Sequence, residues 1–423
     1  MPDGSSTAHL YRPKLITVLG EGYGMALFRA DLIASITVAI VALPLSMAIA
    51  VASGVGPERG LYAAIIGGTL VSALGGSRYQ IGGPAGAFIT LVAATVVRFG
   101  IEGLLLTVML SGLMLVVLGA LRIGSLIRHI PHAVTIGFTS GIALTIFVGQ
   151  LKDLGGLTLP SPEPGPLLAK LQTIAGAVDT ITPAALTLGL VTAALIFTLR
   201  HFRPLWPRKL IAVVLASAAV AILHLPVVTI GSRFGGIPHG LSWPQLPPVS
   251  WSLILAVLPS ALSFTLLGGI ESLLSAKVAD GMTARHHRSN MELVAQGIAN
   301  IASALFGGIS VTGTIARTAT NIRAGARTPL AGILHAAILL VFIMVAAPLA
   351  SYVPLCALAA VLVVVCWNMA ERAEFARLLA TWRTAAVLLA TFGFTVLVDL
   401  TAGIVAGCAI AAALALGSRF AAR

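Results

Sequence analysis

Charged residues are scarce in this chain, and their scarcity excludes most classes of soluble protein. Only 9% of the 423 residues are Asp, Glu, Lys or Arg, whereas soluble globular domains carry roughly 25%. Hydrophobic residues make up 58% of the sequence, and the mean hydropathy is +1.01. Apolar runs of about 18 or more residues recur along the chain, each long enough to cross roughly 30 Å of hydrocarbon. The composition therefore predicts an all-α polytopic membrane protein.

Cysteine is also rare, and common enzyme motifs are absent. Cys356, Cys366 and Cys408 lie in apolar runs without CxxC spacing, which favours small core residues over redox or metal-binding roles. The sequence contains no phosphate-binding loop, no GxSxG nucleophile elbow and no paired carboxylates within its apolar runs. These absences argue against an ATP-driven pump and against a membrane enzyme. We expect no metal and no cofactor other than a coupling ion, either a proton or sodium.

Reading the apolar runs and the breakers between them predicts fourteen spans. Segments 161–180 and 225–250 are predicted to be external loops because their prolines disfavour a regular helix. Residues 368–382 place apolar side chains on one helical face and charges on the other, which predicts a helix in the membrane interface. The spans lie near residues 31–52, 60–75, 84–98, 102–121, 132–151, 182–200, 209–224, 252–279, 291–306, 314–323, 329–347, 353–369, 383–398 and 400–417.

The cationic residues lie mostly between alternate apolar runs. If both termini are cytoplasmic, twenty of the 26 Lys and Arg lie on the cytoplasmic side, five lie outside and Arg317 lies within the membrane. Such an asymmetry sets the orientation of a membrane protein. It also explains the net charge of +12 without a nucleic-acid partner. We therefore expect a multi-pass protein of the cell (inner) membrane with both termini in the cytoplasm.

Two glycine-rich stretches interrupt apolar runs where a spanning helix should be continuous. They are QIGGPAGAFIT at 80–90 and GGISVTGTIARTAT at 307–320. Non-helical backbone at membrane depth survives only where it is buried in protein or lines a water-filled cavity. The stretches fall in the third and tenth spans, which are equivalent places in two halves of seven, and this is typical of an inverted-repeat transporter. The alternative is that the glycines only let helices pack closely.

Each interruption would present the N-terminal end of a half-helix to the site, and such an end favours an anion. Pro84 suits the first turn because it has no N–H, which leaves the amides from Gly86 to Phe88 to point at a ligand. Thr314 offers a hydroxyl in the second stretch. Arg317, one turn further on, adds a full positive charge at membrane depth, and its alternative role is to snorkel to the interface.

Glu271 is the other costly charge inside an apolar run. An apolar surrounding favours the neutral carboxyl, so this group could gain and lose a proton near neutrality and couple transport to protons. Ser275 lies one helical turn further on the same side. Two alternatives remain open: a structural ion pair between Glu271 and Arg317, or a cluster of Glu271 with Lys277 and Asp280 at the cytoplasmic exit.

Two stretches resemble a known family. The segment ESLLSAKVADGMTARHHRSNMELVAQGIANIASALFGGISVTGTIARTATNIRAGARTPLAG (271–332) resembles the signature region of the sulfate permease (SulP) anion transporters. ADLIASITVAIVALPLSMAIAVASGVGPERGLYAA (30–64) resembles their first span, and the resemblance extends from about residue 12 to 417. It implies a core domain of spans 1–4 and 8–11, a gate domain of spans 5–7 and 12–14, and elevator-like or rocking motion between them.

The resemblance also implies a domain order. A cytoplasmic segment (1–30) precedes a first inverted repeat of seven spans (31–224), and the external loop (225–250) leads to a second repeat of seven spans (251–417). Most members continue into a soluble STAS domain. Residues 418–423 end this sequence without one, as a shortened protein or as a natural short form. Members tend to dimerise, so the resemblance implies a homodimer in the lipid bilayer.

The implied substrate site lies between the third and tenth spans, with a contribution from the first. Members often have Pro-Gln in the first span where this chain has Pro44 and Leu45, and prestin-like members have a serine in place of Ala316. These departures leave the anion open between sulfate, bicarbonate and a dicarboxylate such as fumarate. The candidate residues are Pro44, Leu45, Ser46 and Ile49 in the first span, Gly83, Ala85, Gly86, Ala87 and Phe88 in the third, and Thr314, Ile315, Ala316 and Arg317 in the tenth.

The resemblance bears on coupling as well. A related sodium-coupled bicarbonate transporter binds sodium through an aspartate and a threonine at the positions of Glu271 and Ser275. A glutamate without a second carboxylate favours a proton, as in the similar fold of a uracil symporter. The expected function is proton-coupled symport of a small anion by alternating access. The alternatives are a passive anion channel or exchanger, and sodium-coupled bicarbonate uptake.

Overall fold

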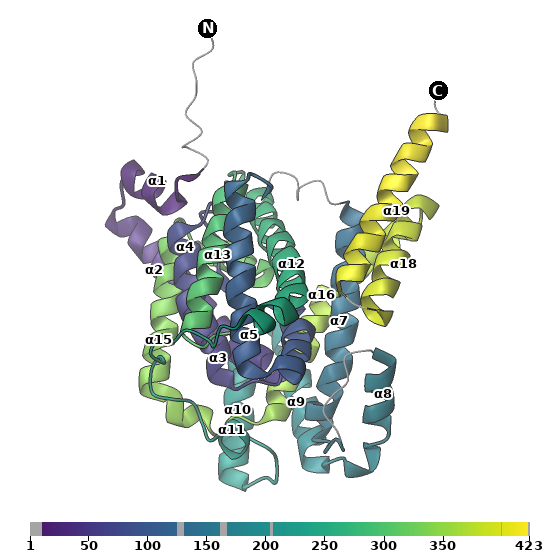
Figure 1. The fold of residues 1–423 in the computed structure, drawn as a ribbon. Helices are drawn as coiled ribbons and strands as arrows, with labels where there is room; N and C mark the ends of the chain where they lie inside the picture. Colours follow the sequence, from purple (N-terminus) through teal and green to yellow (C-terminus); the bar gives the residue numbers. More distant parts are fainter. Residues whose placement is uncertain (1–10, 125–130, 161–166, 204–205, 399, 422–423) are drawn as a thin grey trace. The chain divides into compact units, whose positions relative to one another are not determined.

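The computed structural model describes residues 11–124, 131–160, 167–203, 206–398 and 400–421, which are mostly helical (Figure 1). In this part of the chain, seven helices are long and apolar enough to cross a membrane, judged by length and composition. The helical class is confirmed, and the fourteen-span inverted repeat stays a prediction.

The helices are α1 (Lys14–Glu21), α2 (Met25–Ala52), α3 (Pro57–Tyr62), α4 (Gly68–Leu74), α5 (Ile89–Ala120), α7 (His132–Gly155), α8 (Leu167–Ala175), α9 (Pro183–Phe202), α10 (Arg208–Leu223), α11 (Ile230–Phe234), α12 (Trp251–Thr283), α13 (Ser289–Leu305), α14 (Ile315–Arg323), α15 (Leu330–Ala350), α16 (Leu355–Met369), α17 (Arg372–Leu378), α18 (Trp382–Leu397) and α19 (Leu400–Ala421). Shorter elements are the π-helical turn η2 (Ala63–Gly67), the 3₁₀ turns η3 (Gly86–Phe88) and η4 (Val178–Thr180), and the strands β1 (Gly82–Gly83) and β2 (Thr312–Gly313).

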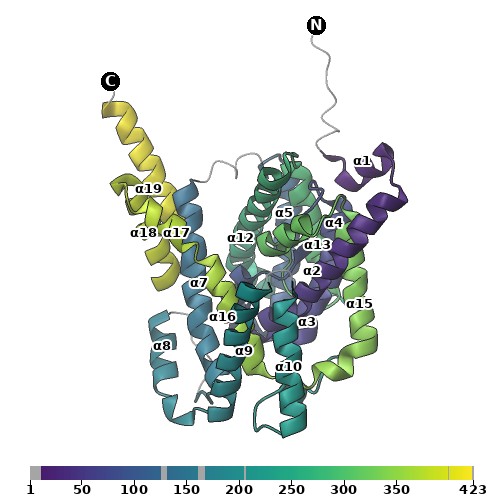
Figure 2. The ribbon, with the colours of Figure 1, turned by 180° about the vertical axis from the view of Figure 1, so that it is seen from behind.

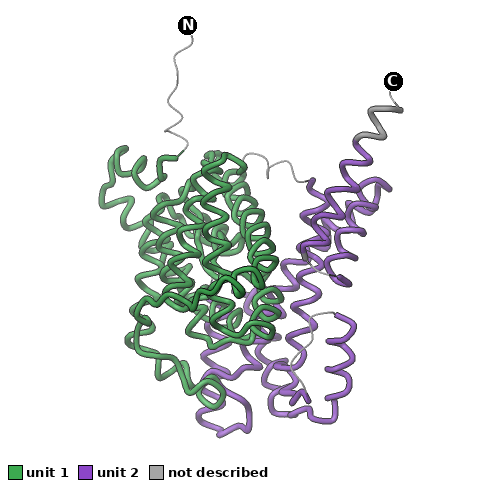
Figure 3. The backbone as a smooth tube through the Cα atoms, viewed as in Figure 1, with its two compact units in different colours: residues 1–128, 230–351 green, residues 129–229, 352–423 purple. Residues whose placement is uncertain are grey.

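The chain forms two compact units, each discontinuous in sequence (Figure 3). Unit 1 consists of residues 1–128 and 230–351, and unit 2 consists of residues 129–229 and 352–423. Within unit 1, α2 packs beside α15 and α13 packs beside α5 (Figures 1 and 2). Within unit 2, α7 packs against α16 and α18. The segments of unit 1 are those that the resemblance assigns to the core, and those of unit 2 are assigned to the gate.

The third and fourth predicted spans are two helices that meet within α5 (Ile89–Ala120). Residues 84–98 and 102–121 were expected as separate spans, and the two helices join at Gly100, whose φ of 70° and ψ of −173° are not helical. Glycine reaches this left-handed region at little cost because it lacks a Cβ atom. The boundary between the two spans is therefore a kink of one residue, with no loop.

The prediction that 161–180 is a loop was wrong for residues 167–175, which form α8. The prolines of this segment end at Pro166, and α8 begins at the next residue. Leu167, Lys170 and Ile174 form its buried side, and the two apolar residues pack in a cluster with Val148 of α7. The residues after Pro166 thus form a helix because their apolar side chains lie on one face that can be buried. Residues 161–166 lie outside the described part of the chain.

The other predicted irregular segments need smaller corrections. Residues 225–250 are mostly without regular structure, as expected, but contain the short helix α11. The interfacial helix predicted over 368–382 is only seven residues long, as α17. Glu371, with a φ of 35°, separates it from α16, and Trp382 already belongs to α18. The helix is therefore shorter than the pattern predicted, because Glu371 interrupts it at one end and α18 begins at Trp382.

The two glycine-rich interruptions meet in unit 1. β1 and β2 pair antiparallel, with Gly82 opposite Gly313 and Gly83 opposite Thr312, and all four residues are buried. Pairing with each other gives the extended backbone the hydrogen bonds that hydrocarbon cannot supply. The stretches are breaks in the helices, so the alternative of packing glycines inside continuous helices is wrong.

Candidate functional site

A helix follows each strand: η3 begins at Gly86 after β1 and leads into α5, and α14 begins at Ile315 after β2. On the second stretch, the N–H of Thr314 donates to the carbonyl of Ile81 at 3.0 Å, and α14 begins at Ile315. The N–H groups of Ile315, Ala316 and Arg317 have no hydrogen-bond partner among the described residues. These are the orphan donors of a helix N-terminus, which favour negative charge. Ala316 is exposed, so this end of the helix is accessible.

The first stretch offers fewer free amides than expected. Its helix begins with the 3₁₀ turn η3, in which the N–H of Phe88 donates to the carbonyl of Ala85 at 3.1 Å. The expectation that the amides from Gly86 to Phe88 are all free is therefore wrong for Phe88, because a 3₁₀ start forms its first hydrogen bond one residue earlier than an α-helix. The N–H groups of Gly86 and Ala87 have no partner in the described part of the chain.

Arg317 joins the two stretches. Its side chain is 0% exposed, so the alternative of snorkelling to the interface is wrong. Its Nη2 donates to the hydroxyl of Ser46 at 3.1 Å and to the carbonyl of Pro84 at 3.2 Å. A Cβ atom added at Gly83 would lie 2.2 Å from Nη1, so the guanidinium packs directly on the backbone of the first stretch.

The positive charge of Arg317 is not compensated within the described residues. Its Nε and Nη1 have no hydrogen-bond partner, and no carboxylate of the described chain lies within 4.0 Å. A buried charge without a counter-ion costs several kcal/mol relative to water. The site is therefore poised to take up an anion, whose charge would offset that cost.

The first-span candidates lie in α2, beside the guanidinium. Ser46 accepts the bond from Arg317 while its own hydroxyl donates to the carbonyl of Ala42 at 2.7 Å. Pro44 and the side chains of Leu45 and Ile49 are buried. Leu45 stands where members of the family often have a glutamine, and in this chain Ser46 supplies a hydroxyl at the arginine.

Two further candidates are held by contacts within unit 1. The hydroxyl of Thr314 lies 3.3 Å from the carbonyl of Ile81 and makes no cap bond to its own helix. The ring of Phe88 lies 5.4 Å from that of Phe264 in α12, at an interplanar angle of 58°. These contacts fix the starts of the two helices against their neighbours, while Ala85 and Ala87 are buried beside them.

Glu271 lies apart from the arginine. It makes no ion pair with Arg317 within 4.0 Å in the described structure, and its Oε2 is buried without a hydrogen-bond partner. The alternative of a structural pair is therefore wrong. Asp280 pairs with His287 at 2.6 Å, whereas Lys277 is exposed, so the charges at this end of α12 do not form the expected cluster either.

Ser275 has a structural contact. Its hydroxyl donates to Oγ1 of Thr318 at 3.2 Å, and the same oxygen accepts from the N–H of Ile81 at 3.1 Å. The structure thus ties α12, α14 and the residue before β1 together through one hydroxyl, which sequence reasoning missed. No hydrogen bond joins Ser275 to Glu271 among the described residues.

A buried amide network, also missed, supports the second stretch from α13. Gln296 donates to the carbonyl of Val311 at 2.6 Å and accepts from Ser272 at 2.6 Å. Asn300, one turn further, donates to the same carbonyl at 2.8 Å. Gln80, before β1, donates to Ser272 at 3.2 Å. Amide side chains spaced four apart inside an apolar run were the available signal, since buried polar groups need partners.

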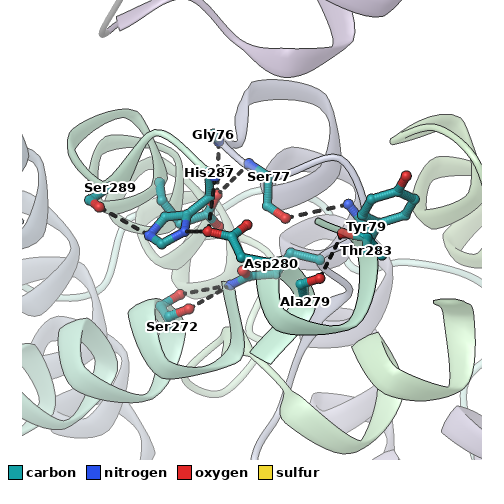
Figure 4. A network of polar contacts seen from close by, with 11 residues as sticks. Gly76, Ser77, Tyr79, Ser272, Ala279, Asp280, Thr283, His287 and Ser289 are labelled. Carbon is teal, nitrogen blue, oxygen red and sulfur yellow. Dashed lines mark hydrogen bonds and ion pairs between the residues drawn. The ribbon is translucent and has the colours of Figure 1, made fainter. Parts of the chain in front are cut away.

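A second polar network lies where α4, α12 and α13 end or begin (Figure 4). The Oε2 of Glu292 accepts from the N–H groups of Gly76 at 2.8 Å and Ser77 at 3.0 Å. His287 contacts Asp280 through Nδ1 and Ser289 through Nε2, at 2.6 and 3.0 Å. The contacts of Glu292 and His287 join the ends of helices of unit 1 and involve none of the candidate site residues.

A bundle of apolar helices, with two helix ends and an unpaired arginine buried together, defines a membrane transport protein of small charged solutes. The comparison with known sequences gives the family. The chain belongs to the sulfate permease family, whose sequence profile matches residues 28–392. It is a transporter and not an enzyme, as the sequence predicted.

Relatives and solved structures agree with this assignment. The chain is 42% identical over 394 residues to YvdB of Bacillus subtilis (strain 168), a provisionally named sulfate transporter, and the match covers 92% of this chain and 74% of YvdB. It is 32% identical over 406 residues to the bicarbonate transporter BicA of Picosynechococcus sp. (strain ATCC 27264 / PCC 7002 / PR-6), covering 92% and 70%.

The fold is similar to solved transporters as well. The transmembrane domain of a cyanobacterium bicarbonate transporter BicA superposes with a TM-score of 0.83 at 32% identity, covering 90% of this chain and 98% of that domain. SLC26A9 superposes with a TM-score of 0.89 at 17% identity, covering 97% and 69%. The second likeness shows the fold alone.

Proposed function

We propose that this chain is a secondary active transporter that carries a small anion across the membrane, with Arg317 binding the anion between the two helix breaks. One observation carries the proposal. The guanidinium is fully buried, two of its nitrogens have no partner, and no described carboxylate lies within 4.0 Å. An anion would complete the hydrogen bonds and offset the charge.

The helix ends support the same ligand. Free amides of Ile315 and Ala316 on one stretch, and of Gly86 and Ala87 on the other, add partial positive charge near the guanidinium. Leu45 and Ile49 contribute only apolar surface. The substrate class is therefore a compact inorganic or organic anion: sulfate, bicarbonate or a dicarboxylate such as fumarate. The names of YvdB and BicA, which refer to sulfate and bicarbonate, favour the first two.

Glu271 is proposed as the proton-coupling group. Its carboxyl oxygen is buried without a partner, and no cation of the described chain pairs with it. A proton taken up with the anion would neutralise this group and reduce the charge carried across the membrane. Ser275 would then act by positioning α12 against α14, through Thr318. The division of the chain into two units supports an elevator-like movement of one against the other.

The test is a substrate panel in proteoliposomes. Purified protein is reconstituted, and uptake of sulfate, bicarbonate and fumarate is measured with and without imposed pH and sodium gradients. We expect saturable accumulation of one of these anions. This accumulation should follow the imposed pH gradient and should be abolished by a protonophore. Accumulation that follows sodium instead would identify sodium-coupled uptake. Anion current without a gradient requirement, far above carrier turnover, would identify a channel and overturn the proposal.

A further inference from the structure

Unit 2 contains a groove that the transport site does not use. It has a volume of about 890 Å³, within the roughly 300–1,000 Å³ of typical ligand sites. We call it the apolar groove. It lies between α7, α9, α16, α17 and α18, and several of its side chains are open to the surroundings, since Phe147 is 39% and Trp367 is 49% exposed. Its largest apolar lining residues are Leu144, Phe147, Phe197, Trp367, Phe375 and Phe392.

The apolar groove continues into a polar cavity of about 810 Å³, with which it shares Phe197, Trp367 and Arg372. Two guanidinium groups line this cavity. That of Arg372 lies 3.7 Å from the ring centroid of Trp367, and that of Arg200 donates to Oδ1 of Asn368 at 2.7 Å. Trp367 and Asn368, at the end of α16, thus hold the two guanidinium groups where the apolar groove meets the polar cavity.

Acidic groups also line the polar cavity, and they are not equivalent. Glu374 is partly neutralised, because it pairs with Arg377 at 3.4 Å and with His132 at 3.1 Å. Glu371 forms no ion pair within 4.0 Å in the described structure. It faces the same cavity as Arg200 and Arg372. A bound anion would therefore gain from the two arginines and be opposed by Glu371.

We propose that this paired cavity binds a phospholipid with an anionic headgroup, with an acyl chain in the apolar groove and the phosphate against Arg200 and Arg372. Guanidinium groups recognise phosphate through paired charge-assisted hydrogen bonds. An apolar groove that opens beside them in a membrane protein matches the amphipathic shape of a lipid. A lipid is favoured over a second copy of this chain because of charge complementarity. The cationic Arg200 and Arg372 line the polar cavity at the end of the groove, where the negative headgroup would lie.

The proposal is tested by native mass spectrometry of the full chain in detergent, titrated with phosphatidylglycerol or phosphatidylcholine. The unchanged protein should retain phosphatidylglycerol in preference to phosphatidylcholine. The double variant Arg200→Gln/Arg372→Gln should lose about tenfold or more of the phosphatidylglycerol affinity, as expected for lost hydrogen bonds to a charged group. Its affinity for phosphatidylcholine should change less.

Two further variants make the result specific. Arg383→Gln is the matched control, because Arg383 also lies over a tryptophan, at 5.6 Å from the Trp382 ring, but lines neither cavity. Glu371→Gln should raise the phosphatidylglycerol affinity, which damage to the fold would not do. The proposal is overturned if the double variant binds like the unchanged protein, if Arg383→Gln loses as much affinity, or if the groove is covered by a second copy and no lipid is retained.

Discussion

At the scale of single residues, Arg317 decides what this protein can bind. Its guanidinium is held by Ser46 and Pro84 and is otherwise without partners in the described chain. We expect Arg317→Gln to weaken anion binding by about 1.5–3 kcal/mol, the usual value for a hydrogen bond to a charged group. Isothermal titration with the transported anion measures this loss. Arg323→Gln, an exposed change in the last turn of the same helix, should leave the affinity unchanged.

Glu271 gives the second prediction at this scale. Glu271→Gln keeps the size and polarity of the side chain but removes the titratable carboxyl, so proton-driven accumulation should be abolished while anion exchange persists. Glu102→Gln, an exposed carboxyl in α5, serves as the control and should accumulate anion normally. Uptake and counterflow assays in the same proteoliposomes separate the two activities. Continued accumulation by Glu271→Gln would show that another group couples the proton.

At the scale of elements, the close approach of β1 to α14 makes one glycine testable. Gly83→Ala would place a Cβ atom 2.2 Å from Nη1 of Arg317, so the guanidinium must move. We expect anion affinity to fall by about tenfold while the protein remains folded, measured by titration together with a thermal melt. Gly281→Ala in α12 meets nothing within 4 Å and should leave the anion affinity unchanged. Unaltered affinity in Gly83→Ala would show that the present position of Arg317 is not needed for binding.

The same elements show how far the sequence alone leads. Gly-Gly-Pro and the second glycine-rich stretch identified both helix breaks, because regular helices exclude such residues. The pairing of Gly82 with Gly313 depends on residues 231 positions apart, and no local pattern encodes it. The 3₁₀ start that uses the N–H of Phe88 was likewise invisible, since a difference of one residue in hydrogen bonding leaves the apolar pattern unchanged.

Electrostatic partners were harder still to predict. The sequence identified Arg317 and Glu271 as costly charges, yet it left their mutual pairing open, and the structure separates them. Thr318, Gln80 and Gln296 were not among the residues that the sequence singled out. Their roles appear only when distant segments meet, because a hydrogen bond between residues 192 or 237 positions apart is set by the tertiary fold.

At the scale of the whole molecule, the predicted orientation gives the last test. The preceding loop (225–250) and the turn after α12 (Trp251–Thr283) should lie on opposite sides of the membrane if this helix spans it. Trp243, 86% exposed, is predicted outside, and Arg285, also exposed, is predicted in the cytoplasm because cationic residues concentrate there.

Single cysteines introduced as Trp243→Cys and Arg285→Cys, in a background with Cys356, Cys366 and Cys408 replaced, report each side through a membrane-impermeant maleimide. We expect Trp243→Cys to react in intact cells and Arg285→Cys to react only after lysis. The reverse pattern would place both termini outside if seven spans precede this loop and seven follow it. Reaction of both in intact cells would mean that α12 does not cross the membrane, and Glu271 would then not lie within a span.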